Sequence, residues 1–118
     1  GWEPIAYEGA RGWGGDAMAV FASEERTRWL LVWRTAWDAP VEAREFAEAF
    51  ARRARVWRAF DGQTDLETPA PQDGSAVTWE GRDGARLLLA RDSDRLDILY
   101  AADEEALDAG RRYLAGEF

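Results

Sequence analysis

The stretch that most constrains the fold of this chain is residues 28–50, RWLLVWRTAWDAPVEAREFAEAF. Aromatic and β-branched residues dominate its first part, and both alternating sets of side chains are apolar, as in an interior β-strand that is covered on both faces. In its second part, apolar residues recur at three- and four-residue spacing, which is the pattern of an amphipathic helix. The sequence therefore predicts a buried strand over residues 28–37 that passes directly into a helix.

Asp38 stands where the predicted strand ends and the helix begins. Its carboxylate could accept a backbone N–H at the start of the helix, and Pro40 suits the first helical turn. The helix is predicted to have one apolar stripe, which comprises Ala43, Phe46, Ala47, Phe50, Ala54 and Trp57, and to pack on the sheet through its aromatic members Phe46, Phe50 and Trp57.

The rest of the chain adds further strands and a second helix. A short edge strand over residues 5–7 and a strand over 16–22 precede the central stretch, and a three-strand meander follows over 75–80, 85–91 and 96–101. Asp103 is predicted to cap a last helix. Residues 16–50 and 85–114 thus share a plan of strand, turn, strand, aspartate and helix. We expect one α+β domain over residues 1–118, with an antiparallel sheet of about five strands, two helices and a ββα-βββα layout.

The composition excludes several classes of function. The chain of 118 residues has no Cys and no His, which removes the thiolate nucleophile, the imidazole base and the usual zinc ligands. Its 23 acidic residues outnumber 15 basic ones, all of them arginine, for a net charge of −8. Such an acidic chain is a poor partner for nucleic acid or an anionic membrane surface, and no stretch is long enough for a membrane span.

Three segments carry a resemblance to other proteins: residues 12–16 (GWGGD), 31–38 (LVWRTAWD) and 43–50 (AREFAEAF). Together they resemble a pattern in uncharacterised secreted or surface-anchored proteins of high-GC bacteria and haloarchaea. The chain is also loosely similar to the antiparallel α/β sandwich of the Mog1/PsbP class. The resemblance implies an extracytoplasmic setting (secreted, periplasmic or surface-anchored) and no known catalytic residues. The pattern has a larger polar residue, often arginine, where this chain has Ala17.

The seven tryptophans are the most unusual feature of the composition. A solvent-facing indole could stack on a sugar or an aromatic ligand, whereas a buried one only fills the core. Trp29, Trp33 and Trp57 are expected in the core, because they lie in the interior strand or on the helix stripe. The remaining candidates for ligand or partner binding lie near the start of the chain, its turns and the first strand of the meander: Trp2, Trp13, Asp16 and Trp79.

Carboxylate clusters are the other candidate sites. They occur at residues 92–94, at 103–105, and at Asp61 with Asp65. Paired carboxylates could serve a hydrolase as acid and base, or could bind calcium. However, the turn at 92–94 lacks the glycine and distal glutamate of an EF-hand loop, and turn or capping chemistry explains the other clusters. We therefore expect no metal, no cofactor and no catalytic residues.

These observations favour a non-enzymatic extracytoplasmic accessory or protein-interaction domain. Its partner would be another protein or an adjoining domain, with no role for nucleic acid and no direct insertion into a membrane. The alternative is a domain that binds a small ligand or carbohydrate through exposed tryptophans, and a hydrolase that uses two acids comes third. Because the chain begins at Gly1 rather than Met, we expect a processed product or an excised domain.

Overall fold

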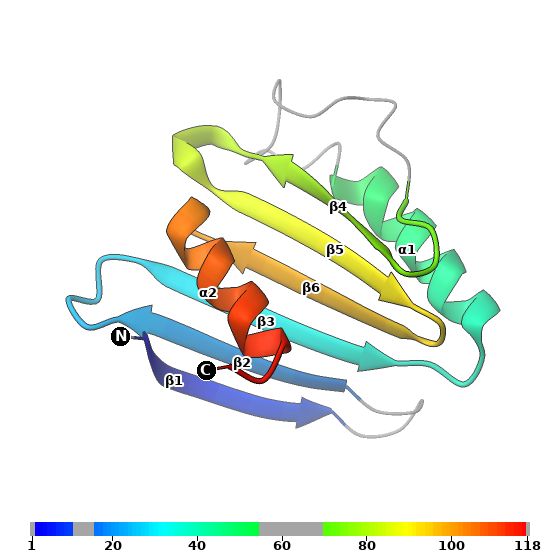
Figure 1. Ribbon diagram of the computed structural model, residues 1–118, viewed down its shortest axis with the longest axis horizontal. Coiled ribbons are helices and arrows are strands. Elements are labelled where there is room, and N and C mark those ends of the chain that lie inside the picture. The colour runs from blue at the N-terminus through cyan, green and yellow to red at the C-terminus, as the bar shows by residue number, and fades with distance from the viewer. Residues whose placement is uncertain (1, 11–15, 55–69, 118) are drawn as a thin grey trace.

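The computed structural model describes residues 2–10, 16–54 and 70–117. In these ranges six strands form one antiparallel sheet, in the order β1-β2-β3-β6-β5-β4, and two helices flank it (Figure 1). The α+β class with an antiparallel sheet is therefore confirmed. Along the chain the elements are β1 (Trp2–Ala10), β2 (Asp16–Ser23), β3 (Trp29–Ala36), α1 (Pro40–Ala54), β4 (Ser75–Glu80), the 3-10 turn η2 (Arg82–Gly84), β5 (Arg86–Asp92), β6 (Arg95–Ala101) and α2 (Glu104–Leu114).

The sheet has six strands, whereas the sequence predicts about five. The largest difference is β1, which runs for nine residues instead of the short edge strand predicted over residues 5–7. Pro4 and Gly9 lower the strand propensity of this segment, and pairing with β2 overrides it. Each helix therefore follows three strands, and the predicted ββα-βββα layout is not confirmed.

The two helices lie on opposite faces of the sheet, with α2 in front of it and α1 behind it in Figure 1. On the α1 face, the helix packs on β5 and β6 over a core that contains Leu87, Leu89 and Ile98. On the α2 face, the helix packs on β3, β5 and β6 over Val32 and Leu99. The core is thus divided into two layers by the sheet.

Small residues let both helices approach the sheet closely. The α1 residues with two per cent exposure or less are all alanines, namely Ala43, Ala47, Ala51 and Ala54. In α2, a Cβ built on Gly110 would lie only 3.0 Å from Leu99 Cδ1. Three members of the predicted α1 stripe are therefore fully buried. Phe46 is partly buried beside Trp33 and Trp37, and Phe50 is partly buried beside Phe46, while Trp57 lies outside the described residues.

The predicted aspartate cap is found at one helix only. Asp103 caps α2, because its Oδ1 accepts a hydrogen bond of 2.8 Å from the Ala106 backbone N–H. In contrast, α1 begins at Pro40, so Ala39 directly precedes the helix. Asp38 lies one residue further out, is exposed, and makes no hydrogen bond to the start of α1 within the described residues.

Candidate functional site

α2 covers only part of its face of the sheet. Under the helix, paired residues of four strands are buried: Ala19, Val32, Leu99 and Leu88. Two residues further along each strand, the register aligns one residue from each of β2, β3, β6, β5 and β4 on this same face, because paired residues of an antiparallel ladder point the same way. These five residues, which we call the alanine row, are Ala17, Arg34, Asp97, Ala90 and Ala76.

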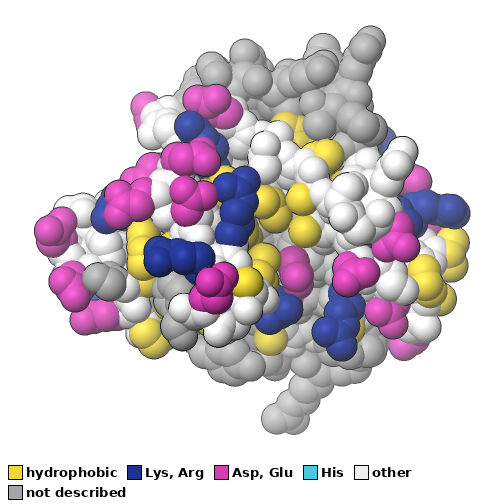
Figure 2. Space-filling view, viewed as in Figure 1, with side chains coloured by type: hydrophobic (Ala, Val, Ile, Leu, Met, Phe, Trp, Pro, Cys, Tyr) yellow, Lys and Arg dark blue, Asp and Glu magenta, His cyan; other side chains and the backbone are white. Residues whose placement is uncertain are grey.

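The alanine row forms the floor of an open trough beside α2. Its three alanines are short, so Arg34 and Asp97 are the only long side chains in the row. Ala36, Arg95 and Asp92 pair across the next row toward the ends of the strands. Two adjoining hollows of about 380 and 420 Å³ share the side chains of Arg34, Arg95 and Asp97. On this face, acidic and basic side chains stand among uncharged and hydrophobic ones (Figure 2).

An ion pair occupies the middle of the trough. Arg34 Nε lies 3.4 Å from Asp97 Oδ1, and the two side chains are 44% and 23% exposed. Burial on the sheet raises the pKa of the Asp97 carboxyl, and the opposing attraction of Arg34 and Arg95 does not fully offset it. Asp97 is therefore a carboxylate whose ionised form depends on its neighbouring guanidinium groups.

Asp16 lies at the β2 end of the trough, but it pairs with Thr35, so its side chain is directed to the α1 face, opposite the alanine row. Trp33 Nε1 donates a hydrogen bond of 3.0 Å to Asp16 Oδ2, and Asp16 lines the same hollow as Arg34. Thr35 lies beside it and is fixed in turn, since its hydroxyl donates to the Leu96 carbonyl oxygen and accepts from Trp37 Nε1. These contacts place Asp16 at the rim with one of its oxygens already occupied.

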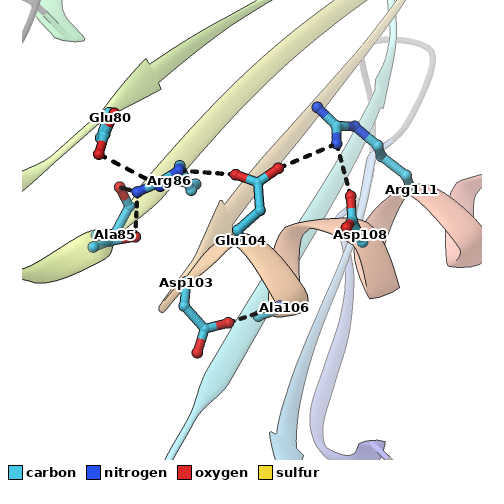
Figure 3. A network of polar contacts seen from close by, with 9 residues as sticks. Glu80, Ala85, Arg86, Asp103, Glu104, Ala106, Asp108 and Arg111 are labelled. Atoms are coloured by element: carbon cyan, nitrogen blue, oxygen red, sulfur yellow. Dashed lines mark hydrogen bonds and ion pairs between the residues drawn. The ribbon is translucent and has the colours of Figure 1, made fainter.

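Charged side chains attach α2, which borders the trough, to the sheet (Figure 3). Arg86 Nε lies 3.0 Å from Glu104 Oε2, while its terminal nitrogens reach Glu80 and the Gly84 carbonyl oxygen. On the other side, Arg28 pairs with Glu105 at 2.9 Å. This network is internally satisfied and positions the first turn of α2, so it is not itself a candidate site.

Comparison with known proteins gives one match. The profile of a family described as a domain of unknown function, DUF8575, matches residues 4–111. The chain belongs to the DUF8575 family. All residues of the trough fall within the part that matches DUF8575. No curated protein and no solved structure matches the chain significantly.

In this DUF8575 domain the residues singled out from the sequence do not form one site. Trp2 and Asp16 lie at opposite ends of the hairpin of β1 and β2. Trp2 is partly buried, with the Arg28 guanidinium carbon 5.3 Å from its ring centre. Trp79 is only 2% exposed and packs under α1, so it offers no surface to a ligand from solvent. Trp13 lies outside the described residues.

Sequence reasoning did not identify the central residues of the trough. Arg34 and Asp97 are far apart in the chain, and only the pairing of β3 with β6 brings them together. Asp92 was part of a carboxylate cluster in the sequence, and the structure places it at the rim of the trough opposite Arg95. Trp29, which the sequence assigned to the core, is the most exposed described tryptophan at 40%.

Within the described ranges, no three His, Cys, Asp or Glu side chains come together to hold a metal ion. Neither described helix has the length and apolar character needed to cross a membrane.

Proposed function

We propose that this chain is a non-enzymatic interaction domain of an extracytoplasmic protein, and that a segment of a partner protein or adjoining domain lies in the trough beside α2. The observation that carries this proposal is the alanine row. Short side chains on either side of the Arg34–Asp97 pair leave room for a backbone to approach the sheet across five strands, a span of roughly 19 Å at about 4.8 Å per strand.

The shape of the trough favours a peptide segment over a small molecule. A small-molecule site is normally a concave pocket that surrounds most of its ligand. The trough is instead shallow and spans five strands. A segment that runs parallel to α2 could contact the floor along its whole length while its outer side stayed in solvent.

The chemistry of the trough favours binding over catalysis. The chain supplies no His, Cys or Lys, and the two groups at the centre of the trough neutralise one another. The extracytoplasmic part of the proposal rests on the resemblance of residues 12–16, 31–38 and 43–50 to secreted and surface-anchored proteins. Of the proposed residues that the structure describes, only Asp16 borders the trough.

Selection from a displayed peptide library tests the proposal. The library is panned on the wild-type domain, and each enriched peptide is then measured against two variants. Ala90→Gln adds a long side chain to the alanine row between Asp97 and Ala76, whereas Ala49→Gln places the same side chain on the exposed surface of α1. Enriched peptides should lose at least about tenfold in affinity for Ala90→Gln, because the added side chain occupies the floor, and should bind Ala49→Gln normally.

Amide resonances provide the second measurement. Peptides that bind in the trough should shift the resonances of Ala17, Arg34 and Ala90. Peptides that bind Ala90→Gln as well as the wild type would overturn the proposal, as would a library from which nothing is enriched.

Trp29 supports a second proposal, a carbohydrate platform on the α1 face. Its indole is 40% exposed, and the ring of Tyr100 lies 4.7 Å away at an interplanar angle of 54°. Two adjacent aromatic rings of this kind suit the apolar face of a sugar. An oligosaccharide panel that alters the tryptophan fluorescence of the wild type but not of Trp29→Ala would support it, and an unchanged wild-type spectrum would refute it.

A further inference from the structure

The trough contains guanidinium groups with open hydrogen-bond donors, beside the carboxylates of Asp92 and Asp97. Arg34 pairs with Asp97 through Nε, at 3.4 Å from Oδ1, and within the described residues no hydrogen bond from its two terminal nitrogens is found. A guanidinium carries five N–H donors in a planar fork and no acceptor. Arg34 therefore has a free edge, on a side chain that is 44% exposed.

Arg95 adds a second guanidinium to the same hollow. It is exposed, and no ion pair to it is found in the described part of the chain. Arg34 pairs with Asp97 in the ladder and Arg95 lies two residues before Asp97, so the two arginines are diagonal neighbours on one face. Diagonal neighbours have Cα atoms about 7–8 Å apart, which long side chains can bridge.

We propose that the trough is a carboxylate-binding site, in which Arg34 and Arg95 together hold one carboxylate of the partner segment. This inference rests on the proposed function and adds the chemistry that the partner must present. Asp97 is the less exposed member of the central pair and already faces two guanidinium groups, so a cation from the partner has little to gain there. An anion, by contrast, meets unused N–H donors of two guanidinium groups, which bind carboxylates through charge-assisted hydrogen bonds.

The carboxylate is that of an internal Asp or Glu side chain. The trough continues past Arg34 and Asp97 on both sides, over Ala17 toward β2 and over Ala90 and Ala76 toward β4. A carboxylate at a chain terminus would leave the part of the trough on one side of Arg34 and Asp97 unfilled. Because the domain carries a net charge of −8, the partner segment should bear a single acidic residue in a neutral or basic surrounding.

Proton uptake accompanies this binding. Burial raises the pKa of Asp97, and the negative charge of Asp92 raises it as well. The positive charges of Arg34 and Arg95 lower it. Asp16 borders this hollow, and its carboxylate is bonded to Trp33. A partner carboxylate that binds Arg34 weakens the attraction by which Arg34 stabilises the ionised form of Asp97. The pKa of Asp97 therefore rises further in the complex. Affinity should therefore increase as the pH falls toward the ordinary carboxyl range, and decrease as the pH rises through the pKa of Asp97.

A titration with three matched peptides tests the inference on the whole domain. The first probe is an acetylated and amidated alanine–glycine nonapeptide with one central glutamate. The second replaces this glutamate with glutamine, and the third has glutamine and a free terminal carboxylate. The readout is the Nε–Hε resonance of each arginine, assigned with Arg34→Gln and Arg95→Gln. Arg44→Gln is the matched control, since Arg44 lies exposed on α1 and pairs only weakly with Glu48 at 3.9 Å.

The glutamate peptide should shift the resonances of Arg34 and Arg95, and the two other peptides should not. Arg34→Gln and Arg95→Gln should each weaken binding about tenfold or more, whereas Arg44→Gln should leave it unchanged. Asp97→Asn should bind more tightly and lose the rise in affinity with falling pH, so that only the titration of the peptide glutamate remains. Equal shifts with glutamate and glutamine, or binding of the peptide with the free terminus alone, would overturn the inference. Library peptides that bind the trough without any acidic residue would overturn it while leaving the proposed function intact.

Discussion

Asp38 and Asp103 occupy similar places in the sequence, shortly before a helix, but only one of them bonds to its helix. Asp103 Oδ1 accepts the Ala106 N–H, and Asp103 Oδ2 also lies 3.6 Å from Arg28 Nη1. Asp38 is separated from α1 by Ala39, whose carbonyl oxygen accepts the N–H of Glu42. A shift of one residue along the chain thus decides whether an aspartate stabilises the helix.

Replacement of the two aspartates should show this difference directly. Asp103→Ala should lower the free energy of unfolding by about 1 kcal/mol, because the N–H of Ala106 loses its acceptor. Asp38→Ala should change it by no more than about 0.5 kcal/mol, as for an ordinary surface site. Urea denaturation followed by circular dichroism measures both. Equal losses for the two variants would contradict the assignment of the caps.

Some residue positions could be read from local pattern and others could not. In β4, Val77 and Trp79 alternate with the exposed Thr78 and Glu80, so a period of two is enough to put Trp79 on the core side, although the sequence analysis named it as a candidate for binding. The trough has no such local signal. Its residues come from five strands, and their alignment depends on the register of four separate ladders.

α1 depends on alanine where it meets the sheet. Its four most buried residues are alanines, while Phe46 lies at the side of the helix, with ring centres 6.0 Å from Trp33 and 5.0 Å from Trp37. The aromatic residues therefore close the edge of the helix–sheet contact, and the alanines set its distance. The sequence predicted the position of this stripe but assigned the main contact to its aromatic members.

Enlarging one buried alanine should show whether the alanines set the distance between α1 and the sheet. Ala47→Leu should destabilise the domain by about 1–3 kcal/mol, because a fully buried position has no room for the extra atoms. Ala49→Leu is the matched control on the exposed side of the same helix and should have an effect within about 0.5 kcal/mol. Thermal unfolding of both variants provides the comparison. A tolerated Ala47→Leu would show that α1 does not pack closely at this point.

The boundaries of the C-terminal elements follow from sequence more closely than those at the N-terminus. The predicted strands 75–80, 85–91 and 96–101 agree with β4, β5 and β6 to within one residue at each end. Turn residues mark each boundary there, including Asp83, Gly84 and Ser93 with positive φ. β1 has no comparable marks, and its extent is set by its pairing with β2.

At the scale of the whole molecule, each half of the chain completes the other. β3 of the first half pairs with β6 of the second at the centre of the sheet. α1 follows β3 but packs on β5 and β6, and α2 follows β6 but also contacts β3. Neither half can bury its apolar surface alone. The order of the strands and the sides taken by the helices arise from these distant contacts, which local sequence patterns do not encode.

Division of the chain should therefore yield two fragments that fold only together. Fragments of residues 1–69 and 70–118 contain all the described elements. Each should be unfolded by circular dichroism when alone, and an equimolar mixture should recover the sheet. Leu99→Asp in the second fragment should abolish this recovery, because Leu99 is fully buried against Val32. Cooperative folding of either fragment by itself would refute the expectation.

The pairing of Leu30 with Ala101 and of Ala36 with Arg95 also bears on how the chain folds during synthesis. Contacts between segments so distant in sequence close slowly, and sheets that depend on them form in milliseconds to seconds. While residues 95–101 remain in the ribosome, β3 has an unpaired apolar edge and no α2 to cover it. The need for chaperones should therefore be greatest in the interval before β6 emerges.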